Sequence, residues 1–265
     1  MPNEQDRVWV DAMPRAYADG LEAAVFAPFA AELARRAAAT APRRVLEVAA
    51  GTGVVTRALA EALPGTDLLA TDLNPAMVRY GGGREARARW EQADAAHLPA
   101  GDGTVDLAVC GFGVMFFPDR PAAYTEVRRV LTPGGRFLFT AWDEVRTHAF
   151  AEALTAGLRA AFPADPPPFV AAVPHGYADP DRIRADLAGA GFTDVDLERV
   201  VRTGTAPSAA AVAEGFCTGT PLRAQIAERG EPAAALRTVG DTMTALLGAG
   251  EVRGEMAAWV AEARR

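Results

Sequence analysis

The alternation of strand-like and helix-like segments is the feature of this sequence that most constrains its fold. Short runs rich in valine, leucine and phenylalanine alternate with segments whose apolar residues recur at helical spacing. This alternation predicts a doubly wound α/β fold, in which helices cover both faces of a mostly parallel sheet. We expect seven strands, at residues 43–50, 66–73, 88–94, 103–113, 136–143, 194–201 and 254–263. Helices are expected within residues 1–39 and at 54–63, 74–80, 120–131 and 181–192.

The composition indicates a cytoplasmic protein with a sizeable core. The chain has 265 residues, of which 50% are hydrophobic, and a formal net charge of −7. This length is enough for one large α/β domain, and the acidic balance argues against a nucleic-acid partner. No apolar run reaches the length of a membrane span, and the first residues lack the pattern of a signal peptide. The two cysteines, Cys110 and Cys217, lie far apart and suit free thiols in a reducing cytoplasm.

The residue inventory argues against several kinds of chemistry. The sequence contains no lysine, which excludes Schiff-base catalysis and a P-loop lysine. Its single serine, Ser208, precedes an alanine-rich run and is expected to cap a helix. Three histidines and two cysteines without zinc-ligand spacing predict no metal site. The sequence therefore offers few residues suited to covalent or metal catalysis.

The stretch RRVLEVAAGTGVVTRALAEALPGTDLLATDLNP, residues 43–75, carries the strongest indication of a ligand. Gly51 and Gly53 lie where the first strand turns into a helix, so a ligand can approach the backbone closely. Asp72 ends the second strand, where a carboxylate can bind the hydroxyls of an adenosine ribose. Asp72 could instead only cap the helix that follows. Thr56 stands where a dinucleotide-binding fingerprint would need its third glycine.

Four ordered segments resemble the motifs of class I S-adenosylmethionine-dependent methyltransferases, in particular the UbiE-like enzymes that act on small molecules. They are VLEVAAGTG, ATDLNPAMV, QADAAHLP, and TVDLAVCGFGVMFFPD followed by EVRRVLTPGGRFLF, and together they cover about residues 40–143. This resemblance implies a Rossmann-like fold and the cofactor S-adenosyl-L-methionine, with S-adenosyl-L-homocysteine as product. Ala49 departs from the family pattern, which usually has glycine there, and the turn could be tighter as a result.

The resemblance also implies a role for individual residues. Glu47 would face the ammonium group of the cofactor, Asp72 the ribose hydroxyls and Asp94 the adenine amino group. Leu73 and Met77 would pack on the adenine. The other implied cofactor positions are Tyr17, Ala49, Ala50, Gly51, Thr52, Gly53, Asn74, Ala95 (through its backbone amide), Ala96, Cys110, Gly111 and Phe112.

We expect a single domain over residues 1–265, with the cofactor core at 40–143 and the last strand within 251–265. Residues 1–39 would form a helical lid, and 144–178 and 204–250 would be insertions that cover the substrate. Residues expected to contact the acceptor are Met115, Phe116, Phe216, Leu222 and Ile226.

The resemblance predicts methyl transfer to oxygen, nitrogen or carbon of a small organic acceptor, by in-line displacement at the sulfonium methyl group. Positioning alone can supply much of the rate, while an oxygen acceptor would also benefit from a base. His148 and His175 are the candidate bases, with His148 preferred, although each could instead only cap a helix or hold a loop. The alternatives are a protein that binds the cofactor without methylating and, less favoured, an NAD(P)-dependent oxidoreductase. The protein could be a monomer or a homodimer.

Overall fold

The computed structural model describes residues 12–265. The predicted N-terminal helical stretch is helical from Ala12 to Ala39, and its residues 1–11 lie outside the described part. It begins with a short α-helix, continues as a π-helix, in which each turn is wider than in an α-helix, and ends as an α-helix. These elements are α1 (Ala12–Tyr17), η2 (Ala18–Phe26) and α2 (Ala27–Ala39).

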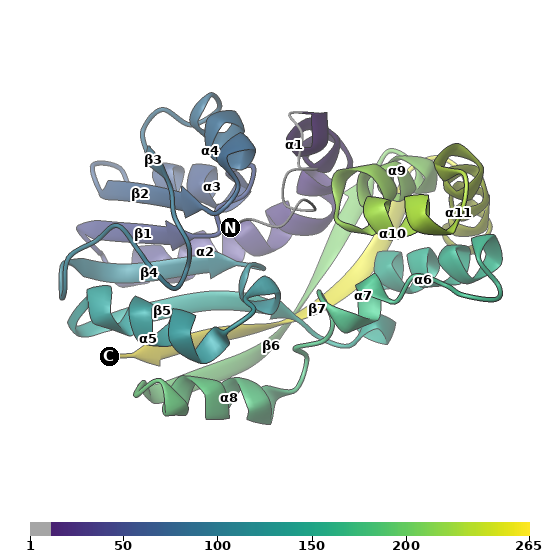
Figure 1. Ribbon diagram of the computed structural model, residues 1–265. Coiled ribbons are helices and arrows are strands. Elements are labelled where there is room, and N and C mark those ends of the chain that lie inside the picture. Colours follow the sequence, from purple (N-terminus) through teal and green to yellow (C-terminus); the bar gives the residue numbers. More distant parts are fainter. Residues whose placement is uncertain (1–11) are drawn as a thin grey trace. The chain divides into compact units, whose positions relative to one another are not determined.

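The seven strands form one sheet in the order β3-β2-β1-β4-β5-β7-β6 (Figure 1). They are β1 (Arg44–Val48), β2 (Asp67–Asp72), β3 (Arg89–Gln92), β4 (Val105–Gly111), β5 (Leu131–Trp142), β6 (Thr193–Ala206) and β7 (Val252–Arg264). β1 pairs in parallel with β2 and with β4, β2 pairs in parallel with β3, and β4 pairs in parallel with β5. The predicted fold, a mostly parallel seven-stranded sheet with helices, is confirmed. β5 and β6 are longer than the sequence predicts.

Several of the remaining helices begin at a residue whose side chain caps them. The predicted cap at Ser208 is confirmed, because its Oγ accepts from the Ala211 N–H at 3.1 Å. Asn74, Asp119 and Asp179 cap three other helices, each with proline at one of the first two helical positions. The helices after β1 are α3 (Val54–Ala62), α4 (Pro75–Gly82), η3 (Val114–Phe116), α5 (Arg120–Val130), η4 (Val145–Thr147), α6 (Ala149–Ala161), α7 (Phe169–Ala172), α8 (Pro180–Gly189), α9 (Ala209–Gly219), α10 (Leu222–Arg229) and α11 (Pro232–Leu247).

The chain divides into two compact units. Among the described residues, unit 1 comprises 12–28, Trp142–Gly176 and Val201–Ala257, and unit 2 comprises Phe29–Ala141, Tyr177–Val200 and Ala258–Arg265. Unit 2 contains strands β1 to β4 and almost all of the motif-bearing segment. The domain boundaries expected from the sequence stay a prediction.

Unit 2 has an aromatic centre beside β5. The ring centroids of Phe137 and Phe139 are 4.9 Å apart, and the Tyr124 ring lies 5.6 Å and 5.8 Å from them. All three side chains are fully buried, so this cluster fixes α5 on the sheet.

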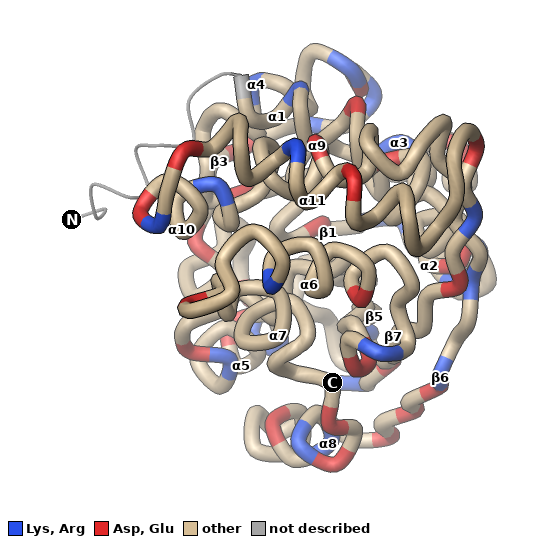
Figure 2. Tube along the Cα trace, turned by 90° about the vertical axis from the view of Figure 1, so that its right-hand side faces the viewer, with Lys and Arg blue, Asp and Glu red and all other residues tan. Residues whose placement is uncertain are grey.

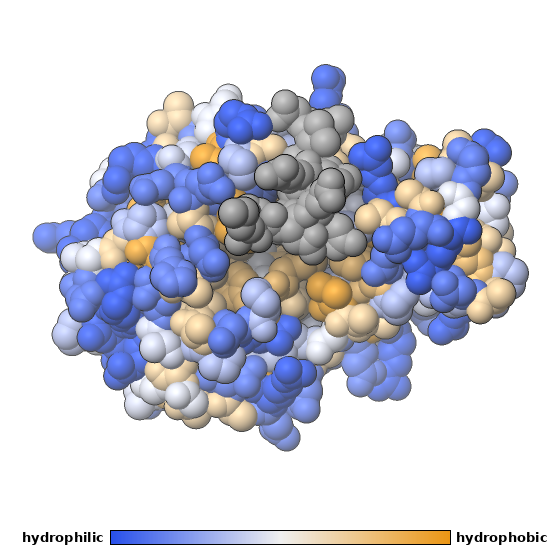
Figure 3. Space-filling model, viewed as in Figure 1, coloured by the Kyte–Doolittle hydropathy of each residue, from blue (hydrophilic) through white to orange (hydrophobic). Residues whose placement is uncertain are grey.

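Unit 1 is built on close backbone contacts at glycine. A Cβ added to Gly20 in η2 would lie 2.5 Å from the Cα of Gly215 in α9, which real atoms cannot do. A Cβ on Gly219 would likewise meet the backbone of Tyr17 at 2.6 Å. α1 and η2 therefore pack against α9 at a distance that only glycine permits. The molecular face in Figure 3 is mostly hydrophilic, as expected where each unit buries its apolar side chains.

Candidate functional site

The turn after β1 in unit 2 is built from backbone that only glycine adopts without strain. Gly51 has φ +55° and Gly53 has φ +85°, and Gly53 is the N-cap of α3. A Cβ built on Gly51 would have nothing within 4 Å, so open space lies over this residue. Ala49 also has φ +56°, a left-handed conformation that costs alanine free energy. The departure from glycine at this position therefore introduces strain into the turn.

Asp72 ties this turn to the end of β2. Its Oδ2 accepts from the Gly51 N–H at 2.8 Å, and its Oδ1 accepts from the Asn74 N–H at 2.8 Å. The following helix is capped by Asn74, whose Oδ1 accepts from the Ala76 N–H, so Asp72 does more than cap a helix. Burial raises the pKa of the Asp72 carboxyl, and the two N–H groups lower it in part. Each carboxylate oxygen keeps a lone pair for a further donor.

Glu47 is a buried carboxyl at the centre of the sheet. It lies on β1 between Ala70 of β2 and Val109 of β4, and only 1% of its surface is exposed. Burial raises the pKa of Glu47 to about 8, and nearby Thr56 and Arg57 offset only part of this effect. The negative charge of Asp72 raises the Glu47 pKa further. An ionised Glu47 is thus unfavourable until a cation comes close.

Several buried polar atoms of unit 2 have no hydrogen-bond partner among the described residues. They are Glu47 Oε2, Thr52 Oγ1, Thr56 Oγ1 and Asn74 Nδ2. Such groups are rare in folded proteins and commonly await a ligand or water. Glu47 lies on β1 and Thr52 in the turn that follows it. Thr56 lies in the first turn of α3, and Asn74 is the N-cap of α4. In the sequence, Thr56 stands out only as the residue where a third glycine is missing. A hydroxyl in the first turn of α3 is the signal that could have identified it as a site residue.

The ends of β2 and β3 offer an apolar and a polar surface. Leu73 is 62% exposed although it follows a buried strand, and Met77 on α4 is buried. Asp94 is exposed, and its Oδ1 accepts from the Ala96 N–H at 2.9 Å. The Asp94 carbonyl accepts from the His97 N–H at 2.8 Å, which closes a tight turn around Ala95.

The end of β4 combines small residues with a strained one. Burial raises the pKa of the Cys110 thiol to about 12, so this thiol stays protonated and is no nucleophile. A Cβ on Gly111 would lie 2.6 Å from the Val55 side chain. Phe112 has φ +56°, and its N–H donates to the buried Thr140 Oγ1 at 3.1 Å. Backbone strain of this kind is typical of functional positions. Thr140 carried no signal in the sequence.

The other predicted positions lie in both units. In unit 2, Met115 is buried and Phe116 is 47% exposed. In unit 1, Leu222 and Ile226 are buried and Phe216 is partly exposed. Tyr17 stacks on Phe26, with ring centroids 5.1 Å apart.

His148 and His175 are brought together in unit 1. Their ring centroids are 5.6 Å apart, and the Trp142 ring lies 4.7 Å from His148. His148 caps α6 because its Nδ1 accepts from the Ala151 N–H at 3.2 Å. His175 Nδ1 donates to the Asp143 carbonyl at 2.6 Å. Burial lowers the pKa of both imidazoles, and for His148 the neighbouring His175 lowers it further.

These hydrogen bonds fix different tautomers in the two histidines. Neutral His148 carries its proton on Nε2, since its Nδ1 is an acceptor. Neutral His175 carries its proton on Nδ1, which leaves Nε2 able to accept a proton. The two histidines therefore differ in what their second nitrogen can do.

Comparisons with known proteins point to one family. Residues 45–135 match the family model described as a methyltransferase domain. The chain is 38% identical over 109 residues to the demethylmenaquinone methyltransferase of Deinococcus radiodurans, which covers 40% of this chain and 45% of that protein. This segment of the chain resembles a methyltransferase domain. The malonyl-[acyl-carrier protein] O-methyltransferase of Geobacter sulfurreducens is 34% identical over 166 residues, covering 59% of this chain and 58% of that protein.

The chain shares its fold with distant solved structures. The [4+2]-cyclase SpnF superposes with a TM-score of 0.58 at 20% identity, over 90% of this chain and 81% of that one. Identity this low shows the fold alone. The chain spans about half the length of the curated relatives it matches.

The residues present fit S-adenosyl-L-methionine, the cofactor that the resemblance to methyltransferases implies. Open space lies over Gly51, and a buried carboxyl on β1 lacks a partner for one oxygen. Asp72 has both oxygens aligned by backbone N–H groups. Residues 12–265 contain no group of three or more histidine, cysteine and acidic side chains that could hold a metal ion. No helix in the same range is long and apolar enough to cross a membrane.

Proposed function

We propose that the chain transfers a methyl group from S-adenosyl-L-methionine to a small organic acceptor. The observation that carries the proposal is the link between Asp72 and the Gly51 turn, together with the buried Glu47, whose Oε2 has no hydrogen-bond partner among the described residues. The Asp72 carboxylate is positioned by two backbone N–H groups beside the open space over Gly51, so it is suited to accept from ribose hydroxyls. The buried Glu47 carboxyl is suited to pair with an ammonium group. Both groups occur in the proposed cofactor.

Each part of the cofactor has candidate partners in unit 2. Asp72 would accept from the ribose hydroxyls and Glu47 would pair with the ammonium group. Leu73 would pack on the adenine, where its 62% exposure leaves an apolar surface to cover. Asp94 would accept from the adenine amino group, with Ala95 contributing its N–H. The Cys110–Phe112 segment would form the floor beside the sulfonium.

When bound, the cofactor supplies a methyl group already activated by its sulfonium charge. The residues of the chain need to hold the acceptor in line and keep water out, which can lower the barrier by several kcal/mol. The exposed ring of Phe116, after β4, is suited to contact an apolar acceptor. The covering roles of residues 1–39, 144–178 and 204–250 belong to this proposal and rest on the sequence.

For an oxygen acceptor we assign the base to His175. Its Nδ1 proton is held by the Asp143 carbonyl, so its Nε2 is the nitrogen that can take a proton. The sequence favoured His148, but the acceptor nitrogen of His148 is occupied by the Ala151 N–H. The lowered pKa of His175 keeps it neutral at pH 7, as a base must be.

The proposal includes a cytoplasmic location, a monomeric or homodimeric state and no nucleic-acid partner. The net charge is −7, and basic residues are interspersed with acidic ones in Figure 2. The relatives named for demethylmenaquinone and for malonyl-[acyl-carrier protein] suggest phenolic or quinol compounds and carboxylic acids as the first acceptors to examine.

Cofactor binding is tested with S-adenosylhomocysteine by isothermal titration calorimetry. We expect Asp72→Ala to lose roughly 10- to 100-fold in affinity, because a charged hydrogen bond to ribose contributes about 1.5–3 kcal/mol. Asp67→Ala is the matched control, since Asp67 lies at the other end of β2 in an exposed pair with Arg89. An unchanged isotherm for Asp72→Ala would place the adenosine elsewhere, and preferential binding of NAD or NADP would favour the oxidoreductase alternative.

Methyl transfer itself is tested by following S-adenosylhomocysteine production with a panel of acceptors. Turnover that depends on both acceptor and wild-type protein supports the proposal. Tight cofactor binding without turnover on any acceptor class would favour a protein that binds the cofactor without methylating. The fold it shares with the cyclase SpnF shows that the architecture alone does not decide between these functions.

A further inference from the structure

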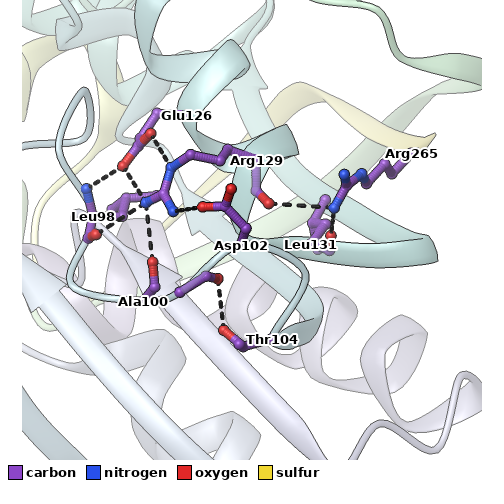
Figure 4. Close-up of polar contacts among 9 residues, drawn as sticks. Leu98, Ala100, Asp102, Thr104, Glu126, Arg129, Leu131 and Arg265 are labelled. Carbon is purple, nitrogen blue, oxygen red and sulfur yellow. Dashed lines mark hydrogen bonds and ion pairs between the residues drawn. The ribbon is translucent and has the colours of Figure 1, made fainter.

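Arg129, in the last turn of α5, joins that helix to the loop that follows the Asp94 turn (Figure 4). Its guanidinium donates to the Ala100 carbonyl at 3.0 Å, to the Leu98 carbonyl at 3.4 Å and to the Asp102 carboxylate. It also forms a bidentate ion pair with Glu126, in which Nε donates to Oε2 and Nη2 donates to Oε1, each at 2.7 Å. One side chain therefore contacts three residues of the loop and one of its own helix.

Glu126 completes the attachment. Its Oε1 accepts from the Leu98 N–H at 2.7 Å, so both backbone polar groups of Leu98 are bonded to side chains of α5. The Arg129 guanidinium lowers the pKa of Glu126, and the pair is ionised at neutral pH. Because the guanidinium is planar and rigid, this bidentate ion pair fixes orientation as well as distance.

The far end of the same loop is also fixed to α5. The Gly103 N–H donates to the Arg129 carbonyl at 3.0 Å, and the Thr104 N–H donates to the Val130 carbonyl at 2.9 Å. Arg265 donates to the carbonyls of Arg129 and Leu131, as Figure 4 shows. The segment from Leu98 to Thr104 is thus held at both ends by one helix.

Before the Asp94 turn, the chain is bonded to β2, because the Ala93 N–H donates to the Asp72 carbonyl at 3.1 Å. Asp94 and His97 are exposed, and the hydrogen bonds inside the turn are local. The first buried residue after the turn is Leu98, which is 5% exposed and bonded to Glu126 and Arg129. The Asp94 turn is therefore held at one end by the bond of Ala93 to β2 and at the other end by Leu98, which Glu126 and Arg129 hold in place.

We propose that Glu126 and Arg129 are positioning residues that set the Asp94 turn and thereby the selectivity of the cofactor site for adenine. The inference rests on the proposed function, because it takes Asp94 as the acceptor for the adenine amino group. The pair acts only through the turn. Its loss should affect discrimination at the amino group more than binding of the rest of the cofactor.

The test compares S-adenosylhomocysteine with its 6-oxo analogue, S-inosylhomocysteine, by calorimetry. In the wild-type protein we expect the analogue to bind on the order of 10- to 100-fold more weakly, because a carboxylate cannot accept a hydrogen bond from a carbonyl oxygen. In Arg129→Ala we expect the dissociation constants of the two ligands to differ by no more than about threefold. Arg129→Lys should restore little of the wild-type difference, since lysine keeps the charge but not the planar fork.

Arg128→Ala is the matched control. Arg128 is the neighbouring arginine of α5 and also holds a loop, through its Nε to the Gly191 carbonyl at 2.8 Å, but that loop is remote in sequence from Asp94. We expect Arg128→Ala to keep the wild-type ratio of the two dissociation constants. If Arg129→Ala does not fold, Glu126→Gln replaces it, since this variant keeps the shape and removes the charge.

The outcomes separate this inference from the proposed function. A wild-type preference for adenine that survives in Arg129→Ala or Glu126→Gln overturns the positioning role alone. Equal binding of both ligands to the wild-type protein also overturns it, because Asp94 would then not read the amino group. A wild-type protein that binds neither ligand overturns both the inference and the proposed function.

Discussion

The protonation of Glu47 gives the sharpest prediction about this protein, through the variant Glu47→Gln. Burial raises the pKa of Glu47 from its ordinary value of 4.5 to about 8 in the folded chain. Between these two values the folded protein keeps the proton while the unfolded chain has lost it. Unfolding then releases a proton, so a rise in pH favours the unfolded state. The contribution of protonated Glu47 to the free energy of unfolding is fully present below pH 4.5 and is lost as the pH rises to about 8.

The size of the effect follows from the same two values. At about 1.4 kcal/mol for each pH unit between 4.5 and about 8, the full loss is roughly 5 kcal/mol. Glutamine has the shape of protonated glutamate and does not titrate. We therefore expect Glu47→Gln to match the wild-type stability near pH 5 and to exceed it by roughly 3–5 kcal/mol near pH 8.5.

Urea denaturation at pH 5.5, 7 and 8.5, followed by circular dichroism, measures this difference. Glu85→Gln is the matched control, because Glu85 is also buried but has its pKa lowered, chiefly by hydrogen bonds from the Arg87 side chain. That variant should gain no stability as the pH rises. Parallel stability curves for wild type and Glu47→Gln would refute the reasoning, since Glu47 would then be ionised in the folded protein.

The same carboxyl connects stability to the proposed cofactor. An ammonium group placed beside Glu47 favours its ionised form, so binding of S-adenosylhomocysteine at pH 7 should release close to one proton. Calorimetry in buffers of different ionisation enthalpy measures that release. The Glu47→Gln variant should release none and bind more weakly.

Three further predictions concern the backbone, unit 1 and the base. Ala49→Gly should stabilise the protein by about 0.5–1 kcal/mol in urea denaturation, because glycine removes the strain of φ +56°; a loss of stability would show that no strain is present. Gly215→Ala should destabilise unit 1, since a Cβ there would lie 2.9 Å from the Cα of Gly20; an unchanged melting temperature would contradict this packing. With an oxygen acceptor, His175→Ala should lower turnover by roughly 10²–10⁴ and His148→Ala by less, with S-adenosylhomocysteine binding intact in both; full activity of His175→Ala would exclude it as the base.

Much of unit 2 could be predicted from the sequence because its signals are local. The alternation of apolar runs and helical periodicity predicted the strands, and in unit 1 Ser208 marked the start of a helix. The glycine turn and Asp72 were visible for the same reason. Each is a residue type that one backbone position or one strand end requires.

The sequence alone did not decide what the tertiary structure does to these residues. Glu47 has its pKa raised because two neighbouring strands bury it, and strand order is set by contacts between distant segments. The tautomers of His148 and His175 depend on hydrogen bonds to backbone atoms, one of them to Asp143, which lies 32 residues before His175. Leu98 and Glu126 meet across 28 residues of sequence. Periodicity and residue type specify elements and candidate positions, whereas protonation, strain and positioning arise only when folding brings separate elements together and excludes water from between them.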